Sequence, residues 1–224
     1  MHTKRINTLL NLIDSQRSVL DIGTDHGYLP ISLKKRNPKQ IIGASDLSPW
    51  PLQAAKKNFN KHDLDDIKTY LSDGLTNITD PYQIIVLSGL GTHTIMSILE
   101  KDPQYLAKVE ELILGTNLEV PELRKWLVQH NYEISEEAIV SDYKYYEFIK
   151  AIPTKEKIGY TKADYLFGPY LRRHQNEAFL DKWLGTYQRN KLLLSKLKNH
   201  PERFSEIDNE QKLIRQELGI KSEI

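Results

Sequence analysis

Short runs of apolar residues alternate along the chain with longer segments in which apolar positions recur every three or four residues. Such runs predict buried strands, and the longer spacing predicts amphipathic helices, of which residues 3–16 are the first. A regular alternation of strand and helix is typical of an α/β fold built around a parallel sheet. The most apolar run, residues 84–87, is expected at the centre of that sheet. The expected strands are the run ending at residue 20 and the runs 40–45, 67–71, 84–87 and 112–114.

The pattern changes after the fifth run. A helix is expected over residues 120–130, and residues 133–140 and 143–151 then predict two strands joined by a turn at Ser141 and Asp142. A hairpin at this point would close the sheet of the first domain. Four aromatic side chains of its second strand are expected in the core: Tyr143, Tyr145, Tyr146 and Phe148.

The last third of the chain has no strand pattern. A polar segment, residues 153–159, reads as a linker, so we expect one domain over residues 1–158 and an extension over 159–224. Two runs of three- and four-residue spacing, separated by His200 and Pro201, predict an antiparallel coiled-coil hairpin. Its seam residues are Leu180, Trp183, Tyr187, Asn190, Leu194 and Leu197, followed by Phe204, Ile207, Gln211, Ile214 and Leu218.

Composition narrows the class of protein. The 224 residues are 39% hydrophobic and 27% charged, which suits a globular chain with one main core. The absence of cysteine excludes disulfides, thiolate zinc sites and a cysteine nucleophile. Neither a membrane-length apolar run nor a signal-peptide pattern is present. We therefore expect a cytoplasmic monomer with no metal and no membrane partner.

The net charge of +1 conceals an uneven distribution. Residues 1–154 carry 17 basic and 20 acidic residues, whereas residues 155–224 carry 14 basic and 10 acidic ones. Basic side chains in the extension are either contacts for a phosphate backbone or a solubilising surface, and charge alone does not separate these interpretations. These residues are Lys182, Arg189, Lys191, Lys196, Lys198 and Arg203.

The strongest candidate for chemistry is the segment VLDIGTDHGYLP, residues 19–30. A strand ending at Asp21 turns through Gly23 and Gly27 into a helix, which is where open α/β sheets bind nucleotide-like ligands. The spacing Asp-x-Gly-x-x-x-Gly differs from the Gly-x-Gly-x-x-Gly of dinucleotide sites. It resembles motif I of class I S-adenosylmethionine-dependent methyltransferases.

Two more acids follow the next two strands. Asp46 ends the second strand, where a carboxylate binds ribose hydroxyls in Rossmann-like sites, and Asp73 follows the third. A second glycine turn, Ser88-Gly89-Leu90-Gly91-Thr92, follows the fourth strand. Together with the first turn, these positions predict one site along a single edge of the sheet.

The order of motifs resembles one family, the bacterial tRNA (adenine(22)-N(1))-methyltransferases, TrmK. The matching segments are LDIGTDHGYLPI, ASDLSPWPLQAAKKN, SDGL, SGLGTHTI and LILGTN. The resemblance implies a seven-stranded, mostly parallel class I methyltransferase sheet, S-adenosylmethionine as cofactor, and tRNA as the partner of the helical extension. It also implies methyl transfer to N1 of adenine 22.

The resemblance assigns roles to residues. The expected catalytic residues are Asp25, His26 and Tyr28, with Asp25 stabilising the positive charge that develops on the base. The expected cofactor-binding residues are Asp21, Gly23, Thr24, Asp25, His26, Asp46, Leu47, Ser72, Asp73, Gly74, Ser88, Gly89 and Leu90. The expected substrate-binding residues are Gly91, Thr92, Asn117, Lys182, Arg189 and Lys196.

Two departures from the family pattern concern the substrate side. The chain has Gly89-Leu90-Gly91-Thr92 where the family usually has Gly-Met-Gly-Gly, and Gly115-Thr116-Asn117 where it has Gln-Pro-Asn. Three alternatives remain open at this point. They are a methyltransferase for another RNA position or a small molecule, a nicotinamide-dependent oxidoreductase, and a non-catalytic RNA-binding protein.

Overall fold

The computed structural model describes residues 3–197 and 199–221, so Lys198 lies outside the described part of the chain. The chain divides into two compact units, residues 1–159 and 160–224. The boundary expected from the sequence falls one residue earlier. The first unit contains a sheet with helices, and the described residues of the second unit form helices.

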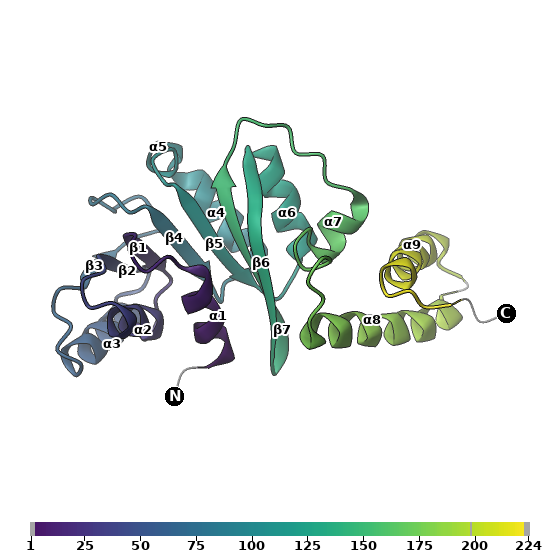
Figure 1. Ribbon diagram of the computed structural model, residues 1–224, viewed down its shortest axis with the longest axis horizontal. Coiled ribbons are helices and arrows are strands. Elements are labelled where there is room, and N and C mark those ends of the chain that lie inside the picture. The colour runs from purple at the N-terminus through teal and green to yellow at the C-terminus, as the bar shows by residue number, and fades with distance from the viewer. Residues whose placement is uncertain (1–2, 198, 222–224) are drawn as a thin grey trace. The chain divides into compact units, whose positions relative to one another are not determined.

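Seven strands form one sheet in the first unit, in the order β3-β2-β1-β4-β5-β7-β6 (Figure 1). Strands β1 to β5 are parallel, and β7 runs antiparallel to both β5 and β6. This confirms the predicted mostly parallel sheet, with β4 at its centre. The strands are β1 (Val19–Ile22), β2 (Ile42–Asp46), β3 (Lys68–Leu71), β4 (Ile84–Ser88), β5 (Glu111–Thr116), β6 (Tyr132–Asp142) and β7 (Lys144–Pro153).

Helices pack on both faces of the sheet (Figure 1). The first three lie on one face, where Leu9, Leu12, Leu33 and Phe59 join the strand residues in the main core. The first helix is shorter than expected from its apolar spacing because Ile13 is already extended. The helices of this unit are α1 (Lys4–Leu12), α2 (Tyr28–Arg36), α3 (Pro49–Asn60), α4 (Thr92–Lys101), α5 (Pro103–Leu106) and α6 (Val120–Gln129).

The β6–β7 hairpin differs from its prediction at the turn. The ladder continues to an Asp142–Lys144 pair, so Tyr143 alone forms the tip, with a left-handed φ of 60°. Tyr143 is fully exposed, and its predicted place in the core is wrong. Phe148 is buried as predicted, whereas Tyr145 and Tyr146 are half-buried. The alternation was shifted because the turn holds one residue rather than two.

The second unit contains α7 (Lys162–Phe167), α8 (Glu177–Lys196) and α9 (Pro201–Glu217). The Glu217 carboxylate, at the end of α9, accepts hydrogen bonds from Arg172 (2.7 Å) and Gln175 (3.1 Å), which immediately precede α8. The end of α9 therefore lies beside the start of α8, which confirms an antiparallel helical hairpin.

The hairpin seam differs from its prediction at two positions. Trp183, Asn190, Ile207 and Ile214 are buried, but Leu180 and Phe204 are exposed. The buried positions beside Trp183 are Phe179 and Thr186. The cause at Leu180 is α7, a short helix that the periodicity did not indicate. Its Phe167 ring contacts Trp183 edge-on, with centroids 4.6 Å apart, and also contacts Phe179, with centroids 6.3 Å apart.

Candidate active site at the carboxyl edge of the sheet

The carboxyl ends of β1 to β5 meet at one edge of the sheet. The register pairs Ile22 with both Ser45 and Leu87, Asp46 with Leu71, and Ser88 with Gly115. The loops that follow these strands therefore lie side by side, as ligand-binding loops do in open α/β sheets.

The β1–α2 turn depends on its two glycines. Gly23 has a φ of 75°, and its N–H donates to the Ser45 carbonyl at 2.9 Å. Gly27, with a φ of 72°, caps α2, and a side chain there would meet the Phe59 ring at 2.4 Å. Only glycine combines this backbone with this packing. The sequence motif thus reflects the shape that the turn requires.

Asp46 connects the first turn to the second. Its Oδ2 accepts the N–H of Asp25 at 3.2 Å, and its Oδ1 accepts the N–H of Ser48 at 3.0 Å. Asp25 itself is exposed and left-handed, with a φ of 50°. The Asp46 carboxylate therefore helps to hold Asp25 in an otherwise unfavourable conformation.

Asp21 lies beneath this turn and is 6% exposed. Burial raises the pKa of Asp21 from 3.8 to about 6, the Thr24 side chain opposes this rise, and the negative charge of Asp46 adds to it. A carboxyl group with a perturbed pKa, next to a glycine turn, is a feature of functional sites.

The three predicted catalytic residues form an exposed group. His26 Nε2 lies 3.7 Å from Asp25 Oδ1, and the His26 and Tyr28 rings have centroids 5.6 Å apart. The backbone of the group is held from α3, because Asn58 Nδ2 donates to the His26 carbonyl at 2.9 Å. The structure brings these residues together with Asp46, and their catalytic role remains a prediction.

The loop that follows β3 contains a buried serine, Ser72, which shapes the turn, and an exposed acid, Asp73. The buried Ser72 hydroxyl donates to the Gly74 carbonyl at 2.9 Å and accepts the N–H of Asn77 at 3.1 Å. Ser72 thus shapes the turn. Asp73 is exposed and its Oδ2 lies 2.5 Å from Lys101 Nζ. Leu47, in the neighbouring loop, is exposed as well.

The loop that follows β4 packs against the β1–α2 turn. The side chain of Leu90 lies over Gly23. A Cβ atom added at Gly23 would lie 3.5 Å from Leu90 Cδ1, which is ordinary van der Waals contact. Gly89 has open space at its Cβ position, and Ser88 is half-buried. The predicted cofactor-binding residues of β1 and β4 therefore adjoin.

Three predicted substrate-binding residues of this unit differ in exposure. Thr92 is buried, and its hydroxyl donates to the Leu118 carbonyl at 2.6 Å. Its side chain joins the start of α4 to the loop after β5, so a contact with substrate at this position would use the backbone. Asn117 is half-buried and Gly91 is exposed.

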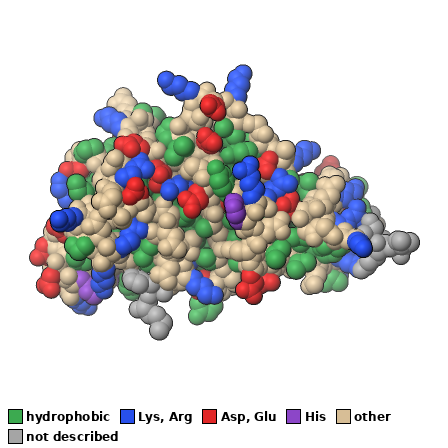
Figure 2. Space-filling view, in the orientation of Figure 1, with side chains coloured by type: hydrophobic (Ala, Val, Ile, Leu, Met, Phe, Trp, Pro, Cys, Tyr) green, Lys and Arg blue, Asp and Glu red, His purple; other side chains and the backbone are tan. Residues whose placement is uncertain are grey.

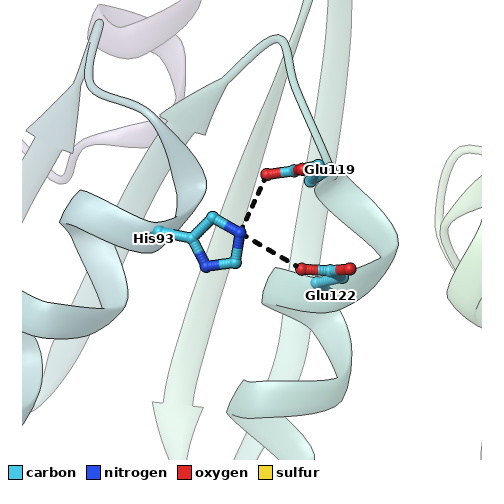
Figure 3. Close-up of side chains that lie close together, drawn as sticks. All are labelled: His93, Glu119 and Glu122. Carbon is cyan, nitrogen blue, oxygen red and sulfur yellow. Dashed lines mark ion pairs between the residues drawn. The ribbon is translucent and has the colours of Figure 1, made fainter.

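A histidine and two glutamates lie close together beside this edge (Figure 3). His93 Nε2 lies 3.2 Å from Glu119 Oε2 and 3.6 Å from Glu122 Oε2. All three side chains are exposed, and the two ion pairs link α4 to the start of α6. The sequence did not predict this group, because the rest of α4, all of α5 and all of β5 separate His93 from the glutamates.

The three basic residues predicted to bind substrate, Lys182, Arg189 and Lys196, all lie on α8. Lys182 is half-buried with its ammonium 4.5 Å from the centre of the Trp183 ring, whereas Arg189 and Lys196 are exposed. Arg189 also donates to the Thr186 hydroxyl at 2.9 Å. On the face shown in Figure 2, basic and acidic side chains are intermixed rather than segregated.

A profile of the tRNA (adenine(22)-N(1))-methyltransferase family, TrmK, matches residues 19–220. The chain belongs to the TrmK family. The match confirms the resemblance found in the motifs, and it spans both units.

Individual TrmK proteins support this assignment. The Bacillus subtilis tRNA (adenine(22)-N(1))-methyltransferase is 31% identical over 188 residues, which is 81% of this chain and 79% of the relative. The Streptococcus pneumoniae protein Sp1610, solved with S-adenosyl-L-methionine, has a TM-score of 0.87 and 30% identity, covering 97% of this chain and 100% of that one. M. capricolum TrmK, solved with S-adenosyl-homocysteine, has a TM-score of 0.85 and 31% identity, covering 96% and 97%.

TrmK membership decides among the alternatives raised by the sequence. A class I methyltransferase, rather than a nicotinamide-dependent oxidoreductase, accounts for the match along the whole fold.

Within the described residues, the helices are all too short or too polar to cross a lipid bilayer.

Proposed function

We propose that this chain transfers a methyl group from S-adenosylmethionine to N1 of adenine 22 in tRNA. The observation that carries the proposal is the link from Asp46 to Asp25 across the glycine turn, found at the carboxyl edge of a TrmK fold. We place the enzyme in the cytoplasm as a monomer, with tRNA as its macromolecular partner.

The residues at this edge fit the cofactor. Each Asp46 oxygen accepts one backbone N–H, which leaves lone-pair capacity on both oxygens for ribose hydroxyls. The open space beside Gly89 and the exposed apolar side chain of Leu47 suit a flat base, and Asp73 offers a carboxylate for its amino group. When bound, S-adenosylmethionine supplies an electrophilic methyl group on a positively charged sulfur.

The remaining work falls to the chain's own residues. N1 of adenine carries a lone pair, so no residue has to remove a proton before attack. Alignment of the two reactants can supply about 7–11 kcal/mol of the barrier. The product base is a cation, and the Asp25 carboxylate, held at the turn by Asp46, is positioned to stabilise the developing charge.

The target base has to leave any pairing, because N1 lies on its Watson–Crick edge. We assign His26 and Tyr28, whose rings adjoin, to positioning that base. Phosphate contacts from Lys182, Arg189 and Lys196 would offset the cost of unpairing by binding tRNA elsewhere. Gly91 and Asn117 complete the proposed substrate contacts.

Methyl transfer to a pair of transcripts tests this proposal. Labelled S-adenosylmethionine is supplied with an unmodified tRNA that has adenine at position 22, and with the same tRNA carrying guanine there. We expect 1-methyladenosine in the first transcript and no label in the second. Label at another position, or on a small molecule only, would replace the proposed acceptor while leaving the cofactor assignment in place.

Replacing Asp25 by alanine tests the catalytic assignment. We expect kcat to fall by about 100-fold or more, as for other groups that stabilise transition-state charge, with little change in the Kd for tRNA. Asp63→Ala is the matched control, because Asp63 is also an exposed, left-handed aspartate but lies between α3 and β3, at the opposite edge. An Asp25→Ala enzyme as active as Asp63→Ala would contradict the assignment.

A further inference from the structure

The tip of the β6–β7 hairpin carries an aromatic residue that neither folding nor packing explains. Tyr143 is fully exposed and has a φ of 60°. Among the described residues, the other non-glycine residues with positive φ are aspartate, glutamate or asparagine. A bulky aromatic side chain is disfavoured in this conformation, and at this site it gains no burial in return.

The hairpin tip is held firmly from below. The ladder extends to the Asp142–Lys144 pair on either side of the tyrosine. Arg5, at the start of α1, pairs with Asp142 through an Nε–Oδ2 distance of 3.3 Å. The same guanidinium lies over the Tyr146 ring, 4.6 Å from its centre. Tyr143 therefore lies at the end of a paired two-stranded ladder that Arg5 contacts, rather than in a long loop.

The tip projects from the same edge of the sheet as the candidate active site. Thr116, the last residue of β5, pairs with Glu147, so the four residues before Glu147, residues 143–146, extend about 13 Å past the end of β5. Figure 1 shows this turn at the lower end of β6 and β7. The hairpin lies beyond β5, whereas the cofactor candidates lie at the ends of β1, β2, β3 and β4 and in the loops that follow them.

We propose that Tyr143 is a positioning residue that stacks on an unpaired base of the tRNA substrate. Unpaired bases in RNA are recognised by stacking on aromatic side chains, which requires an exposed ring on a rigid support. Lys144, exposed beside it, provides a cation for the adjoining phosphate. The proposal rests on the proposed function for its partner, and it names a contact that this function leaves open.

The test uses substitutions that separate stacking from folding. Tyr143→Asn places a residue that tolerates the left-handed conformation at the tip, so the melting temperature should hold or rise. We expect its Kd for unmodified tRNA to increase about 5- to 150-fold, the range expected for loss of one stacked base. The Kd for S-adenosylmethionine should not change. Tyr143→Phe should retain tRNA binding.

The control is Ile41→Ala. Ile41 is another exposed large side chain, but it precedes β2 at the opposite edge of the sheet, and its loss should not affect tRNA affinity. Unchanged tRNA binding by Tyr143→Asn would overturn the proposal, as would a Tyr143→Phe variant that binds as weakly as Tyr143→Asn. Methylation of a different nucleotide by the wild-type chain would overturn the proposed function alone, because the binding comparison does not depend on the product.

Discussion

Replacing Arg124 by leucine is expected to lower the free energy of unfolding by about 3–5 kcal/mol, the cost of breaking a buried ion pair from one side. Arg124, on α6, is fully buried and donates through Nε to Glu137 of β6 at 2.7 Å. It also donates to Glu147 of β7. Both glutamates are as deeply buried as the arginine, and their charges raise the pKa of Arg124. Leucine would leave two carboxylates in the interior without this cation.

Chemical denaturation of Arg124→Leu beside Arg17→Leu checks this expectation. Arg17 also binds two glutamates, Glu110 at 2.8 Å and Glu111 at 2.9 Å, but it is partly exposed. Its loss should cost less than the loss of Arg124, because Glu110 is exposed and the buried Glu111 keeps a second cation, Lys150, at 3.8 Å. Adding Glu137→Gln and Glu147→Gln to Arg124→Leu should recover part of the lost stability. Equal losses in the two single variants would show that burial does not set the strength of these pairs.

Asp21→Asn is expected to stabilise the fold and to weaken cofactor binding. Since burial raises the pKa of Asp21 from 3.8 to about 6, keeping this group ionised at pH 7 costs up to about 3 kcal/mol. Asparagine has nearly the same shape and carries no charge, so it removes this cost. The same change would weaken S-adenosylmethionine binding by about tenfold or more, through loss of a charged hydrogen-bond acceptor.

The stabilisation should depend on pH in a defined direction. Between pH 4 and 6, the folded wild-type chain holds a proton on Asp21 that the unfolded chain has released, so wild-type stability falls as pH rises through this window. The advantage of Asp21→Asn should therefore be largest at pH 7 and vanish near pH 4. Thermal unfolding across this range measures it, and titration calorimetry at pH 7 measures cofactor affinity. A stabilised variant with unchanged cofactor affinity would remove Asp21 from the site.

The elements that set up the candidate site were predictable because each has a local cause. Gly23 and Gly27 are required by the backbone of one turn, and the apolar runs follow from burial of central strands on both faces. Asp46 was placed correctly because it ends a strand. Each of these features can be predicted from the residues next to it in the sequence, without information on distant contacts.

The features that sequence reasoning missed are produced by contacts between distant segments. The predicted seam position at Leu180 was wrong because Phe167, twelve residues before Phe179, determines which face of α8 is buried. Tyr143 was placed in the core because the sequence does not show that this residue is itself the turn, rather than Ser141 and Asp142. The ion pairs of His93 join α4 to the start of α6, and no spacing rule connects these residues.

The contact of α1 with β6 and β7 has a consequence for synthesis of the chain. The helix leaves the ribosome before β6 and β7 do, and the Arg5 side chain finds its partners only at Asp142 and Tyr146. At about 5–20 residues per second, roughly 7–30 s separate the two events. During that interval the apolar face of α1, with Leu9 and Leu12, lacks its final neighbours. In the nascent chain, α2 can cover part of this face early, and the remainder stays uncovered until the hairpin emerges.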